Sequence, residues 1–222
     1  MLKSQLKDLA GILPVHPGII GREEYTNSSV LILMFEKDNE LSFILQKRSA
    51  NVRQGGEIGF PGGVFDPGRD RNTEDTALRE TMEEMGIPRD KIHLIGQTDS
   101  LITMSGMIVD GFIAVAEIED PQKLDINPAE VENVLSVPVS FFEENDPEIF
   151  SVNAVVQSSV IDSSGNEKII FPAKELDLPE RYHKSWGGSL RKVYLYRYGG
   201  ELIWGMTARF IFDLAGMIKE LK

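Results

Sequence analysis

Three glutamates in the sequence have the spacing that a metal site on one helix requires: Glu80, Glu83 and Glu84. On a helix, which turns about 100° per residue, positions i, i+3 and i+4 fall within an arc of roughly 100°. Like charges at this spacing repel each other by a few tenths of a kcal/mol per pair. A hard divalent cation such as Mg²⁺ or Mn²⁺ prefers oxygen ligands and would remove that repulsion. An acidic helix face is more often simply solvated, so its surroundings must decide between the two interpretations.

The segment that carries these glutamates is predicted to be a helix from Thr73 to Met85. Asn72 or Thr73 can cap its first turn, and Gly86 followed by Pro88 can end it. Three apolar residues fall on the side opposite the glutamates, and we expect this side to pack on a sheet: Leu78, Met82 and Met85.

A glycine-rich loop and an arginine flank the acidic face. Gly62 and Gly63 precede the helix and allow a close approach of the backbone. Residues 79–87 read Arg-Glu-Thr-Met-Glu-Glu-Met-Gly-Ile, which resembles the R-E-U-x-E-E-x-G-U half of the Nudix box, where U is usually aliphatic. This resemblance implies that Arg79 orients a glutamate through a salt bridge. It also implies a Mg²⁺ or Mn²⁺ cofactor with three ligands: Glu80, Glu83 and Glu84.

The first half of the box departs from the family pattern. The family has a glutamate eight residues before the arginine, where this chain has Arg71. Gly63 lies sixteen residues before Arg79, two more than the family spacing. Either Asp66 or Asp70 takes the role of the missing glutamate, or the role is absent.

Further segments resemble the coenzyme A diphosphatase branch of the family, for which a longer loop is typical. The spacing from Arg53 to Gly56 is one residue shorter than in that branch. The segments that carry the resemblance are Ile44–Ser49, Phe60–Gly63, Thr103–Gly106, Asn127–Val131, Val137–Pro138 and Ile203–Ala208.

The resemblance implies hydrolysis of the diphosphate of coenzyme A or an acyl-CoA to phosphopantetheine and adenosine 3′,5′-bisphosphate. A carboxylate would take the proton of the attacking water, and the candidates are Glu83, Glu84 and, on a separate segment, Glu130. The candidate substrate-binding residues are Lys47, Arg48, Arg53, Gly62, Gly63 and Ser105. The cations are equally well explained as surface charges, and Ser105 with Gly106 as a simple turn.

Two alternatives remain open at this point. The same chemistry could act on ADP-ribose, on NADH or on a damaged nucleoside triphosphate. A non-catalytic domain that senses a nucleotide is the alternative of another class, although such domains usually lose glutamates of the box and this chain retains three.

The overall composition argues against some classes of binding partner. The formal net charge of −12 argues against binding nucleic acid, which normally needs a basic surface. No apolar run reaches the roughly 20 residues that span a bilayer, so we expect no membrane association. The absence of cysteine is compatible with a cytoplasmic location. Divalent cations would let so acidic a chain accept an anionic phosphate substrate.

The strands and helices expected around these residues indicate one α/β (α+β) domain over residues 1–222. The resemblance implies that this domain is a Nudix-type α/β/α sandwich with a mixed sheet. Strands are expected at 28–36, at 41–47, from residue 92, at 107–118, on both sides of the 163–166 turn and around Gly199-Gly200. Helices are expected within the N-terminal lead-in 1–27, at Pro128–Leu135 with Asn127 as its cap, and at the C-terminus. Residues 143–191 form a branch-variable insertion suited to a nucleotide pocket or to a homodimer interface.

Overall fold

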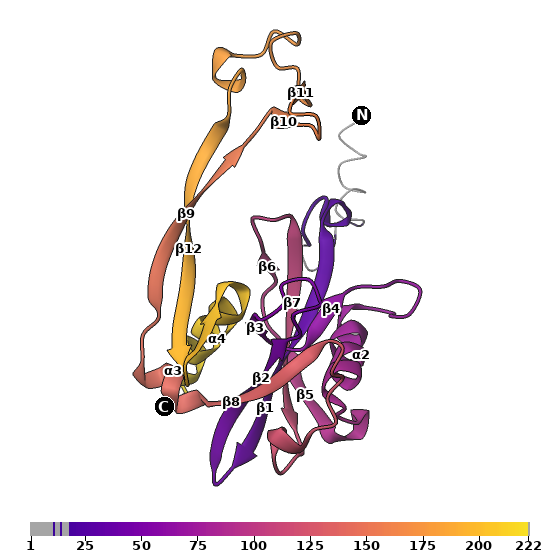
Figure 1. The fold of residues 1–222 in the computed structure, drawn as a ribbon, viewed down its shortest axis with the longest axis vertical. Helices are drawn as coiled ribbons and strands as arrows, with labels where there is room; N and C mark the ends of the chain where they lie inside the picture. Colours follow the sequence, from indigo (N-terminus) through magenta and orange to yellow (C-terminus); the bar gives the residue numbers. More distant parts are fainter. Residues whose placement is uncertain (1–10, 12–13, 15–17, 222) are drawn as a thin grey trace.

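A mixed eight-stranded sheet forms the centre of the computed structural model, which describes residues 11, 14 and 18–221 (Figure 1). Its main path runs β3-β2-β1-β7-β5, and β4, β6 and β8 pair with β1, β7 and β2. β1 is parallel to β7 and antiparallel to β2. The strands are β1 (Thr26–Lys37), β2 (Glu40–Arg48), β3 (Ile58–Gly59), β4 (Gly62–Val64), β5 (Ile92–Gln97), β6 (Leu101–Ile102), β7 (Met107–Ala116) and β8 (Val131–Pro138).

Helices cover both faces of this sheet, which confirms the expected α/β/α arrangement. Alternate residues of a strand point to opposite faces. Leu31 and Leu33 of β1 therefore pack in the core under α2 (Thr73–Met85), whereas Ile32 packs in the core under α4 (Gly205–Lys219). The Asp38-Asn39 turn between β1 and β2 has positive φ at both residues, as a two-residue hairpin loop requires.

Helix α2 has the predicted bounds, and Leu78 and Met85 are buried as predicted, but its buried face is shifted away from Met82. Its cap is confirmed, because the Asn72 side chain accepts a hydrogen bond from the Asp75 backbone at 2.9 Å. The expectation that Met82 packs on the sheet is wrong: this side chain is 40% exposed. The buried arc is instead centred on Thr81, whose hydroxyl donates to the Ala77 carbonyl at 2.7 Å and is therefore satisfied inside. Small residues at these positions let the helix lie close to the sheet.

The helix expected at Pro128–Leu135 is wrong as well. Asn127 opens a turn, in which its side chain accepts from the Ala129 backbone at 3.1 Å, and the chain then continues as β8. The i, i+3, i+4 spacing of the apolar residues fits a helix, but β-branched valines also suit a strand, and β2 offers an edge to pair with. Pairing with β2 overrides the local pattern.

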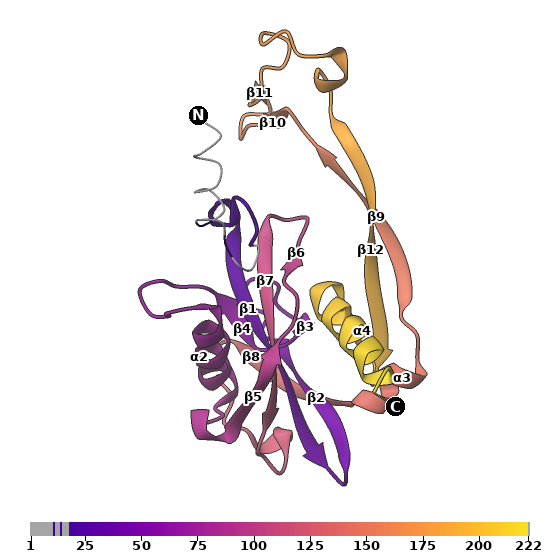
Figure 2. The same cartoon turned by 180° about the vertical axis from the view of Figure 1, so that it is seen from behind.

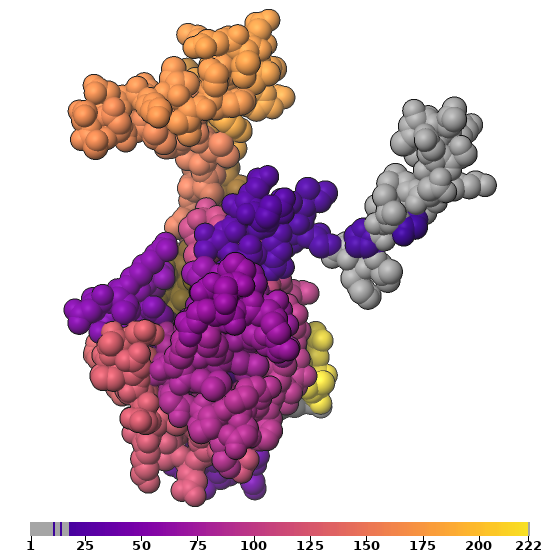
Figure 3. Space-filling model, turned by 90° about the vertical axis from the view of Figure 1, so that its right-hand side faces the viewer, coloured from indigo at the N-terminus to yellow at the C-terminus, as the bar shows by residue number. Residues whose placement is uncertain are grey.

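A second, three-stranded sheet forms an arm (148–198) that extends beyond the central sheet (Figures 1 and 2). Figure 3 shows its outer part standing away from the rest of the molecule. The turns expected at 163–166 and at Gly199-Gly200 are confirmed. The elements in and beside the arm are α3 (Val139–Glu144), β9 (Glu148–Val156), β10 (Ser159–Ile161), β11 (Glu167–Ile169), β12 (Trp186–Tyr198) and β13 (Glu201–Trp204). Across the whole described chain, 3-10 turns lie at Arg22–Glu24, Arg89–Lys91, Pro121–Lys123 and Glu180–Tyr182.

The apolar and charged residues at the start of the chain, for which a helix is predicted, lie outside the described residues. Within the described part of the chain, every helix is too short or too polar to cross a lipid bilayer.

Candidate active site

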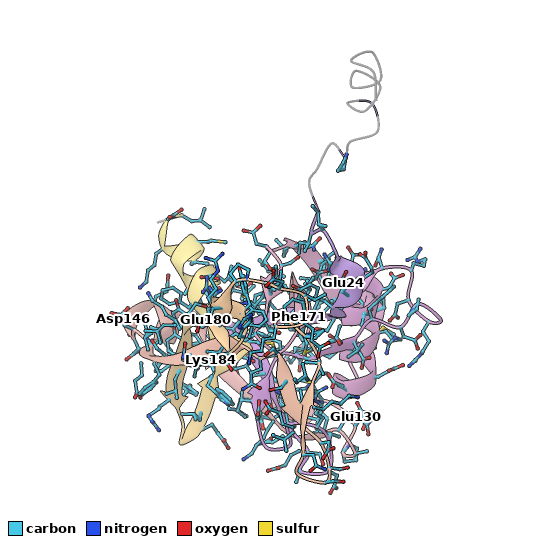
Figure 4. All side chains as sticks on the ribbon, turned by 90° about the horizontal axis from the view of Figure 1, so that it is seen from above. Glu24, Glu130, Asp146, Phe171, Glu180 and Lys184 are labelled. Carbon is cyan, nitrogen blue, oxygen red and sulfur yellow. The ribbon has the colours of Figure 1, made fainter. Side chains whose placement is uncertain are left out.

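Three carboxylates meet beside helix α2: Glu80, Glu84 and Glu130 each offer an oxygen within 4.8 Å of the others. Glu80 and Glu84 lie one turn apart on α2, and Glu130 reaches them from the turn before β8. Glu130 stands at the margin of the molecule in Figure 4. The structure therefore combines two of the predicted metal ligands with the residue that was predicted as an outside candidate for the base.

Two backbone hydrogen bonds bring Glu130 to the helix. The Asn127 N–H donates to the Glu84 carbonyl at 2.9 Å, and the Ser49 N–H donates to the Glu130 carbonyl at 2.8 Å. The turn is thereby tied to the last turn of α2 on one side and to the end of β2 on the other. Because this segment is a turn followed by β8, and not the expected helix, Glu130 lies beside Glu80 and Glu84.

Glu84 is the most enclosed of the three, with a side chain only 3% exposed. Its Oε2 accepts hydrogen bonds from the Gln46 side chain at 2.9 Å and from the Gly62 backbone at 3.0 Å. Arg48 Nη1 lies 3.6 Å from its Oε1. Burial nevertheless raises the pKa of Glu84 to about 7, because desolvation outweighs these stabilising contacts. A cation at this position would favour the ionised carboxylate.

Residue alternation along β2 separates two basic residues that were predicted to act together. Gln46 and Arg48 point to the same face, and both reach Glu84. Lys47 points to the opposite face, where its Nζ pairs with Glu201 at 2.9 Å and with Glu132 at 3.6 Å. Sequence reasoning missed Gln46, although a fully buried amide inside an aliphatic strand is a signal that it has a specific partner.

Asp70, one of the two candidates for the role of the missing glutamate, is the acidic partner of Arg79. Arg79 donates Nε and Nη2 to the two Asp70 oxygens at 2.8 and 2.9 Å, and Thr76 donates to Asp70 as well. This guanidinium holds the pKa of Asp70 well below its usual range. Arg79 Nη1 then donates to Glu80 at 2.8 Å. A chain of contacts from Asp70 through Arg79 thus orients Glu80.

Glu83 does not join the carboxylate group. Its side chain is 41% exposed, and it is paired with Arg79 at 3.0 Å and with Arg69. Two guanidinium groups therefore neutralise Glu83, and its role as a metal ligand stays a prediction.

A cavity of about 420 Å³ borders the carboxylate group. Gly62 forms part of its wall and also donates to Glu84; at its φ of 155° an added Cβ would lie 2.2 Å from the Ser29 carbonyl oxygen. Only glycine fits this close approach. Five predicted substrate-binding residues line the cavity and Lys47 does not: Arg48, Arg53, Gly62, Gly63 and Ser105.

A larger cavity of about 660 Å³ lies along α4 and is lined by Asp146, Arg209 and Asp213 among others. It contains none of the predicted site residues. Asp146 and Glu130 lie on different sides of the molecule in Figure 4.

The donor set at the carboxylate group fits a hard divalent cation. The three side chains offer carboxylate oxygens, the donors that Mg²⁺ and Mn²⁺ prefer. Bringing three carboxylates this close together is unfavourable, and a cation held among them would offset that cost.

Comparisons with known proteins identify the family of this chain. The family model described as NUDIX domain matches residues 26–152. An uncharacterised Nudix hydrolase named NudL from Photorhabdus laumondii is 32% identical over 179 residues, which cover 80% of this chain and 78% of that protein. Nudix hydrolase 3 of Caenorhabditis elegans is 33% identical over 60% of this chain and 57% of its own length. A solved Nudix hydrolase from M. smegmatis, RenU, matches with a TM-score of 0.44 at 20% identity, over 53% of this chain and 73% of that one.

The family match covers more than half of the chain and includes the glycine-rich loop, α2 and Glu130. Nudix hydrolases generally use divalent metal ions, which is consistent with the donor set described above. The chain belongs to the Nudix hydrolase family and is an enzyme that hydrolyses pyrophosphate bonds in a nucleoside diphosphate-linked substrate.

Proposed function

We propose that this enzyme hydrolyses the diphosphate of coenzyme A or an acyl-CoA to phosphopantetheine and adenosine 3′,5′-bisphosphate. The observation that carries the proposal is that two arginines, Arg48 and Arg53, line a cavity directly beside three clustered carboxylates. Coenzyme A has a 3′-phosphate in addition to its diphosphate, so its pocket benefits from more than one guanidinium.

Glu80 and Glu84 would hold Mg²⁺ or Mn²⁺, with the Glu130 carboxylate beside the ion. When bound, the cation supplies charge neutralisation of the diphosphate and a water of lowered pKa. The protein supplies orientation: Gln46 and Gly62 hold Glu84 Oε2, and Arg79 holds Glu80.

Glu130 is the carboxylate that we assign as proton acceptor. Within the described part of the chain, no hydrogen bond or ion pair ties its side chain, whereas Glu84 and Glu83 are both held by neighbours. A carboxylate that must take a proton from water and release it again benefits from that freedom. Glu130→Gln should therefore lower turnover, and an unchanged turnover would remove Glu130 from this role.

The rest of the cavity suits the organic parts of the substrate. Trp204, Met104 and Met206 line it, and both Trp204 and Met104 expose part of their side chains. An aromatic ring and thioether side chains can pack against adenine or pantetheine. ADP-ribose, NADH and nucleoside triphosphates are the alternative substrates, since they share the diphosphate and the base.

A substrate panel with Mg²⁺ or Mn²⁺ tests the proposal. The purified chain is incubated with coenzyme A, acetyl-CoA, ADP-ribose, NADH and nucleoside triphosphates, and the products are identified by mass. We expect the highest kcat/KM on coenzyme A or its thioester, with two products at the predicted masses. Faster hydrolysis of ADP-ribose or NADH would reassign the substrate, and nucleotide binding without any cleavage would favour a sensor.

Glu83→Gln and Glu84→Gln separate the predicted ligands. We expect Glu84→Gln to be far more damaging, because Glu83 is already paired with two arginines. Equal losses would make Glu83 a ligand.

We also propose a location, a class of partner and an oligomeric state. The protein would act in the cytoplasm on a small molecule and not on nucleic acid. We also propose that the protein forms a homodimer.

A further inference from the structure

The arm ends in a strand whose outer edge is unprotected. β9 is the last strand of the order β13-β12-β9, so only one of its edges is paired. Natural proteins blunt such edges with charged residues, proline, bulges or a covering element, because open N–H and C=O groups recruit other strands. Residues 149–161 contain no charged residue and no proline. The neighbouring strand β12, by contrast, carries Arg191 and Lys192.

The side chains of β9 also leave an apolar stripe on the surface. Phe150, Val152 and Val156 point to one face and are 54%, 42% and 50% exposed. They lie across from Val193, Arg191 and Trp186 of β12. A sheet face that meets water is normally polar, and these apolar side chains would pack sideways against those of a strand added at the β9 edge. Of the twenty-four exposed large apolar side chains among the described residues, twelve belong to the arm.

Charge distinguishes the arm from the rest of the chain. Residues 148–198 hold seven Lys or Arg and six Asp or Glu, whereas the other 171 residues hold sixteen and twenty-nine. Two copies that approached through their acidic parts would repel each other. Two arms would not repel each other in this way, because their charges nearly cancel. The uncharged edge of β9 therefore lies in the part of this acidic protein where two copies can meet.

We propose that β9 pairs antiparallel with β9 of a second copy across a twofold axis near Val152, joining the two arms into one continuous sheet. A twofold interface must be self-complementary, and antiparallel pairing of one strand with its own copy meets that condition. With the axis at Val152, Phe150 lies opposite Ala154 of the partner subunit. The single charged residue of the strand, Glu148, faces Val156 of the partner subunit, so no like charges meet.

The choice of a second copy follows from the same features. A peptide or protein of opposite charge would be recognised through charged residues, and the edge from Ile149 to Val156 has none. Beyond β13, which reaches only residues 195–198 of β12, the arm is a two-stranded ribbon of β9 and β12. Isolated two-stranded ribbons are marginally stable in water, and four paired strands from two copies remove that weakness. The inference concerns assembly and does not depend on which diphosphate the enzyme cleaves.

The first test is the mass of the full-length wild-type chain, whose monomer is 24.8 kDa. Light scattering after size exclusion at micromolar concentration should give about twice that value. A monomer over the whole micromolar range would overturn the proposal.

The second test locates the contact and uses the absence of cysteine from the chain. Single variants Ser151→Cys, Val152→Cys, Asn153→Cys and Ala154→Cys are oxidised, and intermolecular disulfides are measured on a non-reducing gel. A disulfide needs Cβ atoms about 3.8 Å apart, which residues near a twofold axis between paired strands approach. We expect at least one of these variants to cross-link at least tenfold faster than Leu190→Cys. Leu190 is a matched control because it is 73% exposed on the same ribbon but lies on β12.

Charge at the axis provides the third test. Val152→Lys and Val152→Glu each place two like charges face to face, so each variant alone should be monomeric. Mixed in equal amounts they should form a heterodimer that native mass spectrometry detects, and Leu190→Lys should stay dimeric. Equal effects of Val152→Lys and Leu190→Lys, or a mixture that stays monomeric while circular dichroism shows both variants folded, would overturn pairing through β9. If both Val152 variants unfold, the cysteine series decides.

Discussion

The carboxylate site and the arm differ in which side chains they bury and which they expose. Around α2, ionised groups are taken inside and each is held by a neighbour: Glu84 by Gln46, and Arg79 by Asp70. On the arm, apolar side chains such as Phe150 and Val152 are left in contact with water, and their strand, β9, has no charged residue from Ile149 to Val156 to protect its edge. The first region suits the proposed cation and substrate within one chain. The second suits the proposed contact with another copy. If both proposals hold, substitutions in one region should leave the other unaffected.

The largest expected effect is on catalysis. Glu84→Gln keeps the shape of the side chain but removes a carboxylate oxygen from the group, and we expect kcat to fall by about 10³-fold or more. Stability should not fall, since a buried charge is removed. Initial rates at saturating substrate and Mg²⁺, with thermal unfolding as a control, measure both quantities. The arm variant Val152→Lys should retain kcat within about twofold; a parallel loss in the two variants would contradict the independence of the two regions.

The second effect is on stability. Asp70→Asn breaks the bidentate pair with Arg79 inside the protein, and we expect the free energy of unfolding to fall by about 3 kcal/mol at pH 7. Because the folded state holds the pKa of Asp70 low, the wild type has this advantage above about pH 4 and loses it on further acidification. Urea unfolding between pH 3 and pH 7 should show the difference narrowing towards low pH. A constant difference would mean that Asp70 acts through packing alone.

A third effect links the cation to the site and not to the arm. Mg²⁺ at 100 times its dissociation constant should stabilise the wild type by about 2.7 kcal/mol, and EDTA should abolish both this stabilisation and hydrolysis. Glu80→Gln should weaken the shift in Tm, whereas Leu190→Lys should leave it unchanged. Differential scanning fluorimetry over a Mg²⁺ titration provides the measurement. An undiminished shift in Glu80→Gln would place the cation elsewhere.

The smallest expected effect is on KM, and it distinguishes two basic residues near the glycine-rich loop. Arg53 lines the cavity, while Lys47 is paired with Glu201 on the opposite face. Arg53→Ala should raise KM about tenfold, equivalent to about 1.4 kcal/mol, and Lys47→Ala should change it less than about twofold. Steady-state kinetics on coenzyme A compare the two. A larger effect of Lys47→Ala would show that it turns towards the substrate when the substrate binds.

Local signals were sufficient for some elements. The cap at Asn72 and the stop at Gly86 predicted both ends of α2, because helix termini depend on side chains and φ values within a few residues. An added Cβ at Gly86 would lie 2.3 Å from the Asp125 carbonyl oxygen, so glycine is needed there for packing as well. The hairpin at Asp38-Asn39 followed from turn residues between two aliphatic runs. The motif on α2 was enough to predict a diphosphate hydrolase.

Other features depended on which segments meet. Residues 128–135 carry a helical spacing of apolar residues, and only the pairing with β2 makes them a turn and a strand. That pairing brings Glu130 to Glu80 and Glu84, whereas Glu83, on the same helix, is taken by Arg69 and Arg79. Local composition determines how a segment can fold, because caps, turns and periodicity act over a few bonds. Which carboxylates share a cation, and which edge stays open, is decided by long-range packing that no short stretch of chain encodes.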